Sequence, residues 1–500
     1  MEEKLKTLTN KLKEIKNINS AIALLHWDQQ VNMPPDGSEA RAEQIATLET
    51  LAHEMFVADE IGVLLNDLAA AGFDYDSDEA ALVRVVQRDY DRERKLPTEL
   101  VEEMSRTFAL GHQVWVKARA GKDFSQFQDI LAKIVDLNIQ KAEAYGYEEA
   151  IYDALLDEFE PGMKAAEVNQ VFDALKVELV PLIQTISKQV DSVDDSCIHQ
   201  DFDEQAQWDF GIEVLRAIGY DFDRGRQDKA PHPFTTSFSI NDVRVTTRIY
   251  KDWLSPGLFA TIHEGGHALY EQNLDLSLEG LPLADGTSLG VHESQSRLWE
   301  NVLGRSLPFW QFYYPRLQSY FPAQLKDVSL ETFYRAINKV TPSFIRVEAD
   351  EVTYHSHIFI RFELEQALLE QRLKVADLPD AWNAKMEEYL GITPPDDALG
   401  VLQDIHWSGG AMGYFPTYTL GTVLSLQFYN QAGQDIPDLP EQFSRGEFGA
   451  LLSWFKDKIH RHGRKFTANE LIEQVTGAKQ VEVGPYLAYI KQKFGEIYEL

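Results

Sequence analysis

Two histidines and a glutamate in the segment 261–270 have the types and the spacing of a metal site. His263 and His267 are four residues apart, so on a helix both imidazoles lie on one face and can converge on one zinc ion. Glu264 follows the first histidine, where it can take a proton from an attacking water. The alternative is a pair of histidines that only satisfy neighbouring polar groups. We interpret the segment as a helix with a hydrolytic metal site and Glu264 as general base.

Two adjacent glycines strengthen this interpretation. Gly265 and Gly266 lie inside the same predicted helix, where each glycine costs about 1 kcal/mol relative to alanine. Residues that break a local rule in this way are typical of a place where another backbone or a substrate approaches closely. We therefore expect a close contact on this face of the helix.

A catalytic zinc needs a third protein ligand and an open position for water. Asn273 stands where the metzincin class has a further histidine, which excludes that class. Glu271 continues the same helix face but lies ~12 Å along the axis from His263, so we expect it to hold an imidazole N–H instead of the metal. The remaining candidates for the third ligand are Glu279, Glu293 and Glu300. We favour Glu293, because the chain between His267 and Glu293 is long enough to turn and bring a second helix alongside the first.

The chain around this segment is predominantly helical in its pattern. The first residues show one apolar stripe at spacings of three and four on a charged helix, formed by Leu5, Leu8, Leu12 and Ile15. Similar patterns predict helices over residues 81–95, 98–120, 124–146 and 165–190. One region differs: residues 234–250 are rich in Thr, Val, Ile and aromatic residues, which predicts a β-hairpin or a small sheet.

The predicted fold class is mainly α, a large multi-helix body with one small β-sheet near the active site. A single hydrophobic core stops growing near about 250–300 residues, so a chain of 500 residues needs several domains or a multilayered body. We place a helical part at residues 1–200 and a catalytic part, with the sheet and the metal helix, at residues 201–500. The alternative is one structural unit.

The charge of the chain disfavours two classes of partner. The sequence has 47 Lys and Arg against 80 Asp and Glu, a net charge of −33. Such a surface repels nucleic-acid phosphates and anionic lipid headgroups.

No apolar stretch approaches the ~20 residues that span a bilayer, and no signal-peptide pattern is present. The single cysteine, Cys197, fits a reducing compartment. We therefore expect a cytoplasmic protein without nucleic-acid or membrane partners.

Six short sequence elements follow one another in a fixed order. They are H-P-F at 232–234, D-x-R-x-T at 242–246, H-E-x-x-H at 263–267, H-E-S-Q at 292–295, I-R-x-x-A-D at 345–350 and G-x-x-Q-D-x-H-W at 400–407. This series resembles the signature of the carboxypeptidase Taq family of metallocarboxypeptidases. No signature position departs from the family pattern, and the similar total length indicates that the resemblance covers the whole chain.

The resemblance implies a largely helical fold with a deep substrate groove, zinc at its floor, and a homodimer. The N-terminal part would form a wall or lid of the groove. It also implies removal of single residues from the free C-terminus of peptides with broad specificity. His263, His267 and Glu293 would be the metal ligands and Glu264 the general base. Two histidines and a glutamate take zinc by default, and Co²⁺ or Mn²⁺ can occupy the same ligands.

The developing oxyanion of such a reaction needs a hydrogen-bond donor besides the metal. His406, Tyr414 and Tyr418 are the candidates, with Tyr414 slightly preferred. Packing in an aromatic-rich core is the alternative role for both tyrosines.

An exopeptidase must also recognise the terminal carboxylate, and the planar fork of arginine pairs both of its oxygens. We prefer Arg346 over Arg244 for this role, although surface ion pairing is the commoner role for an arginine. His232 lies between two prolines that fix its backbone direction. That position suits a rigid wall of a substrate pocket and equally a structural turn.

Two other functions compete with a metallocarboxypeptidase. A zinc endopeptidase or oligopeptidase of related helical architecture would use the same chemistry. A peptide-binding protein that has lost activity is the third interpretation. The intact Glu264 argues against it, because an inactive relative is free to lose its general base.

Overall fold

The computed structural model describes every residue from Met1 to Leu500. The chain is mainly helical with one small sheet, which confirms the predicted fold class. It forms two compact units, each built from three segments of the chain. Unit 1 comprises Met1–Arg94, Asp195–Ile337 and Phe428–Gln480, and unit 2 comprises Lys95–Asp194, Asn338–Gln427 and Val481–Leu500. The division into a helical part at residues 1–200 and a catalytic part at residues 201–500 remains a prediction, as does the substrate groove.

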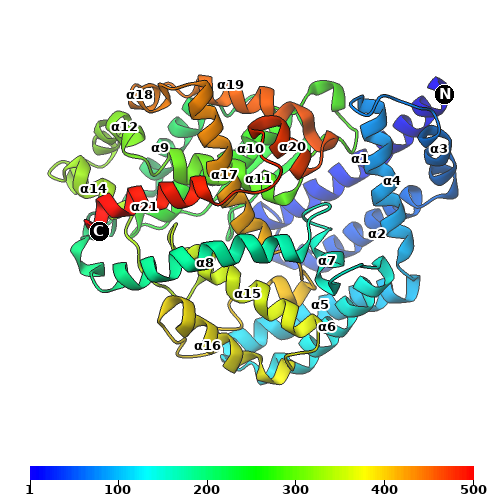
Figure 1. Cartoon of the computed structure of the whole chain (residues 1–500), viewed down its shortest axis with the longest axis horizontal. Coiled ribbons are helices and arrows are strands. Elements are labelled where there is room, and N and C mark those ends of the chain that lie inside the picture. The colour runs from blue at the N-terminus through cyan, green and yellow to red at the C-terminus, as the bar shows by residue number, and fades with distance from the viewer. The chain divides into compact units, whose positions relative to one another are not determined.

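Unit 1 holds the sheet and most of the shorter helices (Figure 1). Its helices before the sheet are α1 (Glu2–Val31), α2 (Ser38–Phe56), α3 (Asp59–Ala69), α4 (Asp78–Lys95) and α9 (Glu204–Ile218). After the sheet follow α10 (Leu254–Gln272), α11 (Leu289–Arg297), α12 (Leu307–Tyr320), α13 (Pro322–Leu325), α14 (Leu330–Ile337), α18 (Leu439–Ser444), α19 (Gly449–Lys458) and α20 (Ala468–Thr476). No helix of the chain has the length and apolar composition needed to cross a membrane.

The first helices of unit 1 share a core of their own. α1 packs along α2, both blue in Figure 1. The apolar stripe predicted on α1 is confirmed, because Leu8, Leu12 and Ile15 are buried there. They belong to one cluster with residues of α3 and α4 such as Leu65 and Val86. Each fully buried leucine contributes about 1.5–3 kcal/mol, so the stripe fixes α1 to its neighbours.

The sheet has three strands in the order β1-β3-β2. β2 (Thr235–Ser239) and β3 (Asp242–Thr247) pair antiparallel, which confirms the hairpin predicted over 234–250. β1 (Gln227–Lys229) pairs parallel with β3 and is an addition that the sequence analysis did not predict. α10 packs against β2 and β3, so the sheet supports the helix that carries the H-E-x-x-H element.

α10 and α11 approach each other closely. A Cβ on Gly266 would lie 2.6 Å from the Cα of Ser296 on α11, and a Cβ on Gly265 would meet the side chain of Leu215 on α9. The close contact predicted from the two glycines is therefore confirmed. Ser288 precedes α11, and its side chain caps the helix by accepting from the backbone N–H of Val291. A π-helical turn over Leu298–Leu303 follows the end of α11.

A segment far along the chain braces α11. His460 belongs to the last segment of unit 1. Its Nε2 lies 2.8 Å from Oε1 of Gln295 on α11. The position of α11 thus depends on residues that are distant from it in the sequence.

Unit 2 is built around α15 (Tyr354–Leu369), which packs against several of its other helices. The helices predicted at 98–120, 124–146 and 165–190 are confirmed as α5 (Thr98–Gly121), α6 (Ser125–Tyr145) and α8 (Ala165–Ser187). The remaining helices are α7 (Ile151–Leu156), α16 (Leu378–Leu390) and α21 (Gly484–Tyr498), and α17 (Pro416–Asp435) runs from unit 2 into unit 1.

Candidate metal centre

Three side chains of unit 1 converge on one point. α10 presents His263 and His267, α11 presents Glu293, and their ligand atoms all lie within 4.8 Å of one another. Oε2 of Glu293 is 3.3 Å from Nε2 of His267 and 3.6 Å from Nε2 of His263. Two imidazole nitrogens and a carboxylate oxygen form a donor set typical of a catalytic zinc site, so the residues present fit a divalent cation.

Glu300 orients the first histidine. Its Oε2 lies 2.8 Å from Nδ1 of His263. A carboxylate only accepts hydrogen bonds, so Nδ1 carries a proton and Nε2, which faces Glu293, is the nitrogen that can bind a metal. Of the three acids considered for the third ligand, Glu293 joins the two histidines and Glu300 supports one of them. Glu279 accepts from the backbone N–H of Ile240 instead.

The second histidine is oriented through another histidine. Nδ1 of His267 lies 2.6 Å from Nδ1 of His292, and Nε2 of His292 lies 2.8 Å from Oε1 of Glu271. For Nε2 of His267 to be bare for a metal, its Nδ1 must carry the proton. His292 then accepts at Nδ1 from His267 and donates from Nε2 to Glu271. Glu271 thus accepts from an imidazole N–H, as predicted from its spacing. That imidazole belongs to His292.

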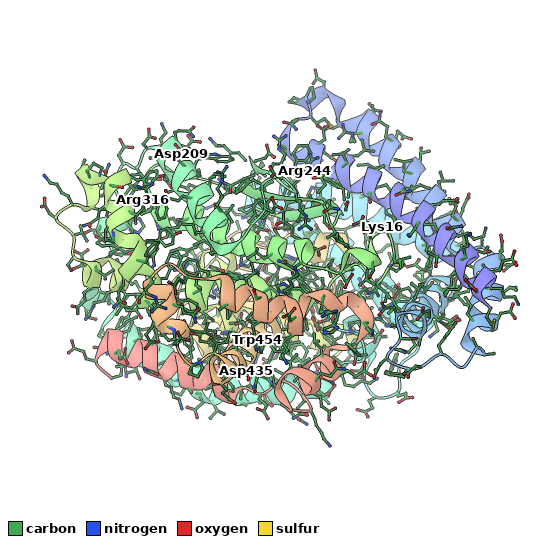
Figure 2. All side chains as sticks on the ribbon, turned by 90° about the horizontal axis from the view of Figure 1, so that it is seen from above. Lys16, Asp209, Arg244, Arg316, Asp435 and Trp454 are labelled. Carbon is green, nitrogen blue, oxygen red and sulfur yellow. The ribbon has the colours of Figure 1, made fainter.

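Positive charge surrounds both carboxylates of this network. Burial alone would raise the pKa of Glu293, but Arg297 and the two histidines hold that pKa well below its usual range. Nε of Arg297 donates to Oε1 of Glu293 at 2.7 Å. The pKa of Glu271 is likewise lowered despite its burial, through His292 and the charge of Lys16 on α1 (Figure 2). Both carboxylates are therefore anionic at neutral pH, which favours cation binding.

Glu264 is held by a hydroxyl from the sheet. Oγ1 of Thr235 on β2 lies 2.6 Å from Oε2 of Glu264 and 3.0 Å from its backbone oxygen. The hydroxyl has one proton, and the charged carboxylate is the stronger acceptor. One carboxylate oxygen is thereby fixed. Thr235 was not predicted from the sequence, because its only distinguishing feature there is its place directly after the H-P-F element.

Arg244 in unit 1 is already paired. It donates from Nε and Nη2 to both oxygens of Asp242 at 2.8 and 2.9 Å. Its guanidinium lies 4.4 Å from the ring centre of Trp27 and 4.8 Å from that of Phe238. Figure 2 shows Arg244 between the sheet and α1. Its charge is matched by one aspartate and covered by two aromatic rings.

His232 lies on the surface of unit 1. Its side chain is exposed, and its Nδ1 lies 2.9 Å from the backbone oxygen of Pro233. This contact stays within the H-P-F element itself.

Arg346 in unit 2 is buried in a cluster of charged side chains. It donates to Asp404 from Nη2 at 2.8 Å and to the hydroxyl of Tyr354 from Nη1 at 2.6 Å. Arg361 donates from Nε to the same Asp404 at 2.6 Å. Two guanidinium groups thus share one carboxylate. Glu365, one turn further along the same helix, also interacts electrostatically with Arg361.

His406 and Tyr414 lie together in unit 2. Their ring centres are 5.3 Å apart, and Nε2 of His406 is 3.5 Å from the hydroxyl of Tyr418. Tyr414 also packs edge-on against Phe159 at 5.2 Å. The structure therefore gathers the predicted residues in two groups, one in each unit.

Comparison with known proteins identifies relatives over nearly the whole chain. The family model described as carboxypeptidase Taq (M32) metallopeptidase matches residues 7–494. Carboxypeptidase 1 of Bacillus subtilis is 40% identical, covering 98% of this chain and 97% of the relative. Thermostable carboxypeptidase 1 of Thermus thermophilus is 43% identical, covering 95% of each chain.

Solved structures agree with this chain along its full length. The M32 carboxypeptidase from Deinococcus radiodurans R1 superimposes with a TM-score of 0.97 at 40% identity and 100% coverage of both chains. A carboxypeptidase from Pyrococcus furiosus gives a TM-score of 0.95 at 38% identity, covering 98% of this chain and 99% of the other.

Proposed function

Because the chain belongs to the carboxypeptidase Taq (M32) family of metallopeptidases, we propose that it removes single amino acids from the free C-terminus of peptides with broad specificity. The chain is a metal-dependent carboxypeptidase. The convergence of His263, His267 and Glu293 within 4.8 Å carries the proposal for where the metal binds.

Glu264 is the proposed general base. His263, His267 and Glu293 would hold a divalent cation, which when bound would supply Lewis-acid polarisation of the scissile carbonyl and lower the pKa of the attacking water. Glu264 accepts a proton from that water and later gives it to the leaving amine. Thr235 holds Oε2 of Glu264, so Oε1 is the oxygen that receives the proton.

We assign recognition of the terminal carboxylate to Arg346. Two arginines share Asp404, whereas Arg244 donates to both oxygens of Asp242. A substrate carboxylate would complete the Arg346 cluster. Arg244 is the second candidate for this role.

His406 and Tyr414 are the proposed donors to the developing oxyanion, because both carry polar hydrogens and their rings lie together. His232 is the proposed wall of the substrate pocket. Both assignments extend the family resemblance to residues of this chain.

We further propose zinc as the native metal, with Co²⁺ or Mn²⁺ as substitutes, because the donor set is two histidines and one glutamate. A homodimer is proposed on the resemblance to the family. The single cysteine supports a reducing compartment, and we place the enzyme in the cytoplasm with peptides as its partners.

Digestion of one short unstructured peptide, as free acid and as C-terminal amide, tests the proposal. With zinc supplied, mass spectrometry should show a ladder losing one residue at a time from the free acid alone. Glu264→Gln should abolish the ladder and retain the metal. Internal cuts in both peptides would instead indicate an endopeptidase, and no cleavage with metal bound would indicate an inactive binder.

A further inference from the structure

A buried carboxylate in unit 2 accepts hydrogen bonds from three separate elements. Glu365 on α15 is 0% exposed. Its Oε1 accepts from Nε1 of Trp407 at 2.7 Å. Its Oε2 accepts from the hydroxyl of Tyr152 at 2.7 Å and from the backbone N–H of Gly413 at 3.1 Å. A buried carboxylate is costly unless its oxygens are paired, so an arrangement with three donors calls for an explanation that the proposed mechanism does not supply.

Two of these donors flank the proposed oxyanion donors. Trp407 directly follows His406, and Gly413 directly precedes Tyr414. Gly413 has φ +90°, and a Cβ there would lie 2.7 Å from the backbone of α7, so only glycine fits where the segment passes α7. Glu365 therefore ties both ends of the stretch between His406 and Tyr414 to one helix.

A second charged residue on the same helix face holds the chain just before His406. Arg361 is one turn from Glu365, so the two side chains share a face of α15. Arg361 is 0% exposed and donates to Oδ2 of Asp404 at 2.6 Å. Side chains of α15 thus form hydrogen bonds with the segment 404–413 at Asp404, at Trp407 and at Gly413.

We propose that Glu365 is a positioning residue, which holds His406 and Tyr414 in the orientation in which they act on substrate. This inference rests on the proposed function, which gives those two residues their role. A carboxylate suits the place because it only accepts hydrogen bonds and faces three donors. A glutamine of the same shape would turn its NH₂ group toward a donor and lose at least one of the bonds.

The test compares two glutamate variants on the same helix. Glu363 accepts from Nζ of Lys176 at 2.7 Å and from the hydroxyl of Tyr389 at 2.8 Å, so Glu363→Gln controls for loss of a bonded carboxylate on α15. We expect Glu365→Gln to lower kcat about 10- to 100-fold, as a misplaced group does. KM and bound metal should stay at wild-type values. Glu363→Gln should keep the wild-type kcat.

Hydrogen exchange at the Gly413 amide gives a readout that does not depend on activity. Exchange should be faster in Glu365→Gln than in the wild type and unchanged in Glu363→Gln. Unchanged exchange in Glu365→Gln would overturn the proposal, as would a lowered unfolding temperature with wild-type kcat. If Glu365→Gln does not fold, Tyr152→Phe removes one donor to Glu365 and should lower kcat by a smaller factor with KM unchanged. A wild-type kcat in Tyr152→Phe would also overturn the proposal.

His406→Ala and Tyr414→Phe separate this proposal from the proposed function. If both keep the wild-type kcat, the role assigned to these residues fails. The response of the Gly413 amide still decides whether Glu365 holds the segment, so the two failures are distinguishable.

Discussion

At the scale of single residues, the two histidines of the metal centre are oriented by unequal means. Glu300 contacts His263 directly, whereas Glu271 reaches His267 only through His292. Each link of the longer chain requires a proton on one particular nitrogen. A substitution at His292 therefore changes which nitrogen of His267 is free to bind a metal, so His267 is the more vulnerable of the two proposed histidine ligands.

His292→Phe should weaken metal binding about 10- to 100-fold, the usual effect of losing a partner that orients a ligand. Phenylalanine keeps a ring at this position but offers no nitrogen to accept from Nδ1 of His267. The dissociation constant is measured by competition with a chromogenic chelator. Glu271→Gln is the matched control, because its amide oxygen still accepts from His292, and it should cost much less. Equal affinities in all three proteins would contradict the proton arrangement.

Thr235→Val should lower kcat on the order of 10-fold or more, because a hydrogen bond to a charged group contributes about 1.5–3 kcal/mol. Valine has the shape of threonine but cannot donate to Oε2 of Glu264. Metal content should be unchanged, and Thr235→Ser should restore most of kcat. Steady-state kinetics with an N-terminally blocked dipeptide measures kcat of both variants. A valine variant as active as the wild type would show that the hydroxyl does not orient Glu264.

At the scale of elements, the separation of α10 and α11 decides whether Glu293 reaches the two histidines. Gly266 permits the contact with the backbone of α11 at Ser296. The π-helical turn that follows α11 carries Glu300, which lies against His263. The distance between α10 and α11 thus places Glu293 near the two histidines, and the π-helical turn places Glu300 against His263.

Gly266→Ala should destabilise the protein by about 1–3 kcal/mol, the usual cost of overpacking, and weaken metal binding by pushing α11 away. Gly495→Ala in α21 is the matched control: a Cβ there meets no atom within 4 Å, so helix propensity should stabilise it by up to about 1 kcal/mol. Chemical denaturation and chelator competition measure the two effects. Tolerance of Gly266→Ala in both assays would refute the role assigned to this contact.

The elements that local pattern determines were predicted from the sequence. The apolar stripe on α1, the hairpin β2–β3 and the helix with His263 and His267 all follow from spacing along a few turns or strands. The contacts of Glu300 and His292 did not follow, because they depend on how α11 is placed against α10. Spacing left Glu279, Glu293 and Glu300 as candidates for the third ligand, and the length of chain before Glu293 favoured that residue. The strand β1 was missed because it has three residues and too little pattern to detect.

At the scale of the whole molecule, Glu365 should make stability depend on pH. Burial raises its pKa from 4.5 to about 7, against the opposing effect of its donors. Folding therefore favours the protonated form of Glu365 relative to the unfolded chain. This contribution is fully present below pH 4.5 and is lost as the pH rises through about 7, a change on the order of 3 kcal/mol.

Denaturant titrations of the wild type and Glu365→Gln at several pH values check this. The free energy of unfolding of the wild type should fall relative to that of the variant between about pH 5 and about pH 8. A constant difference would show that Glu365 has an ordinary pKa.

Metal removal should abolish activity and lower the unfolding temperature. A ligand at 100 times its dissociation constant stabilises the folded state by about 2.7 kcal/mol, and this is lost on chelation. Zinc added back should restore both properties. In His267→Ala the unfolding temperature should be the same with and without zinc, as scanning calorimetry would show. A zinc-dependent shift in that variant would place the metal elsewhere.

The interleaving of the two units has a consequence for the order of events on the ribosome. By the time residue 300 has been synthesised, His263, His267 and Glu293 all exist, yet unit 1 still lacks Phe428–Gln480. That late segment includes His460, which braces α11. Unit 2 is completed later still, by Val481–Leu500. We therefore expect a nascent chain to have its proposed metal ligands long before it can hold them in place, and a prematurely terminated chain to be inactive.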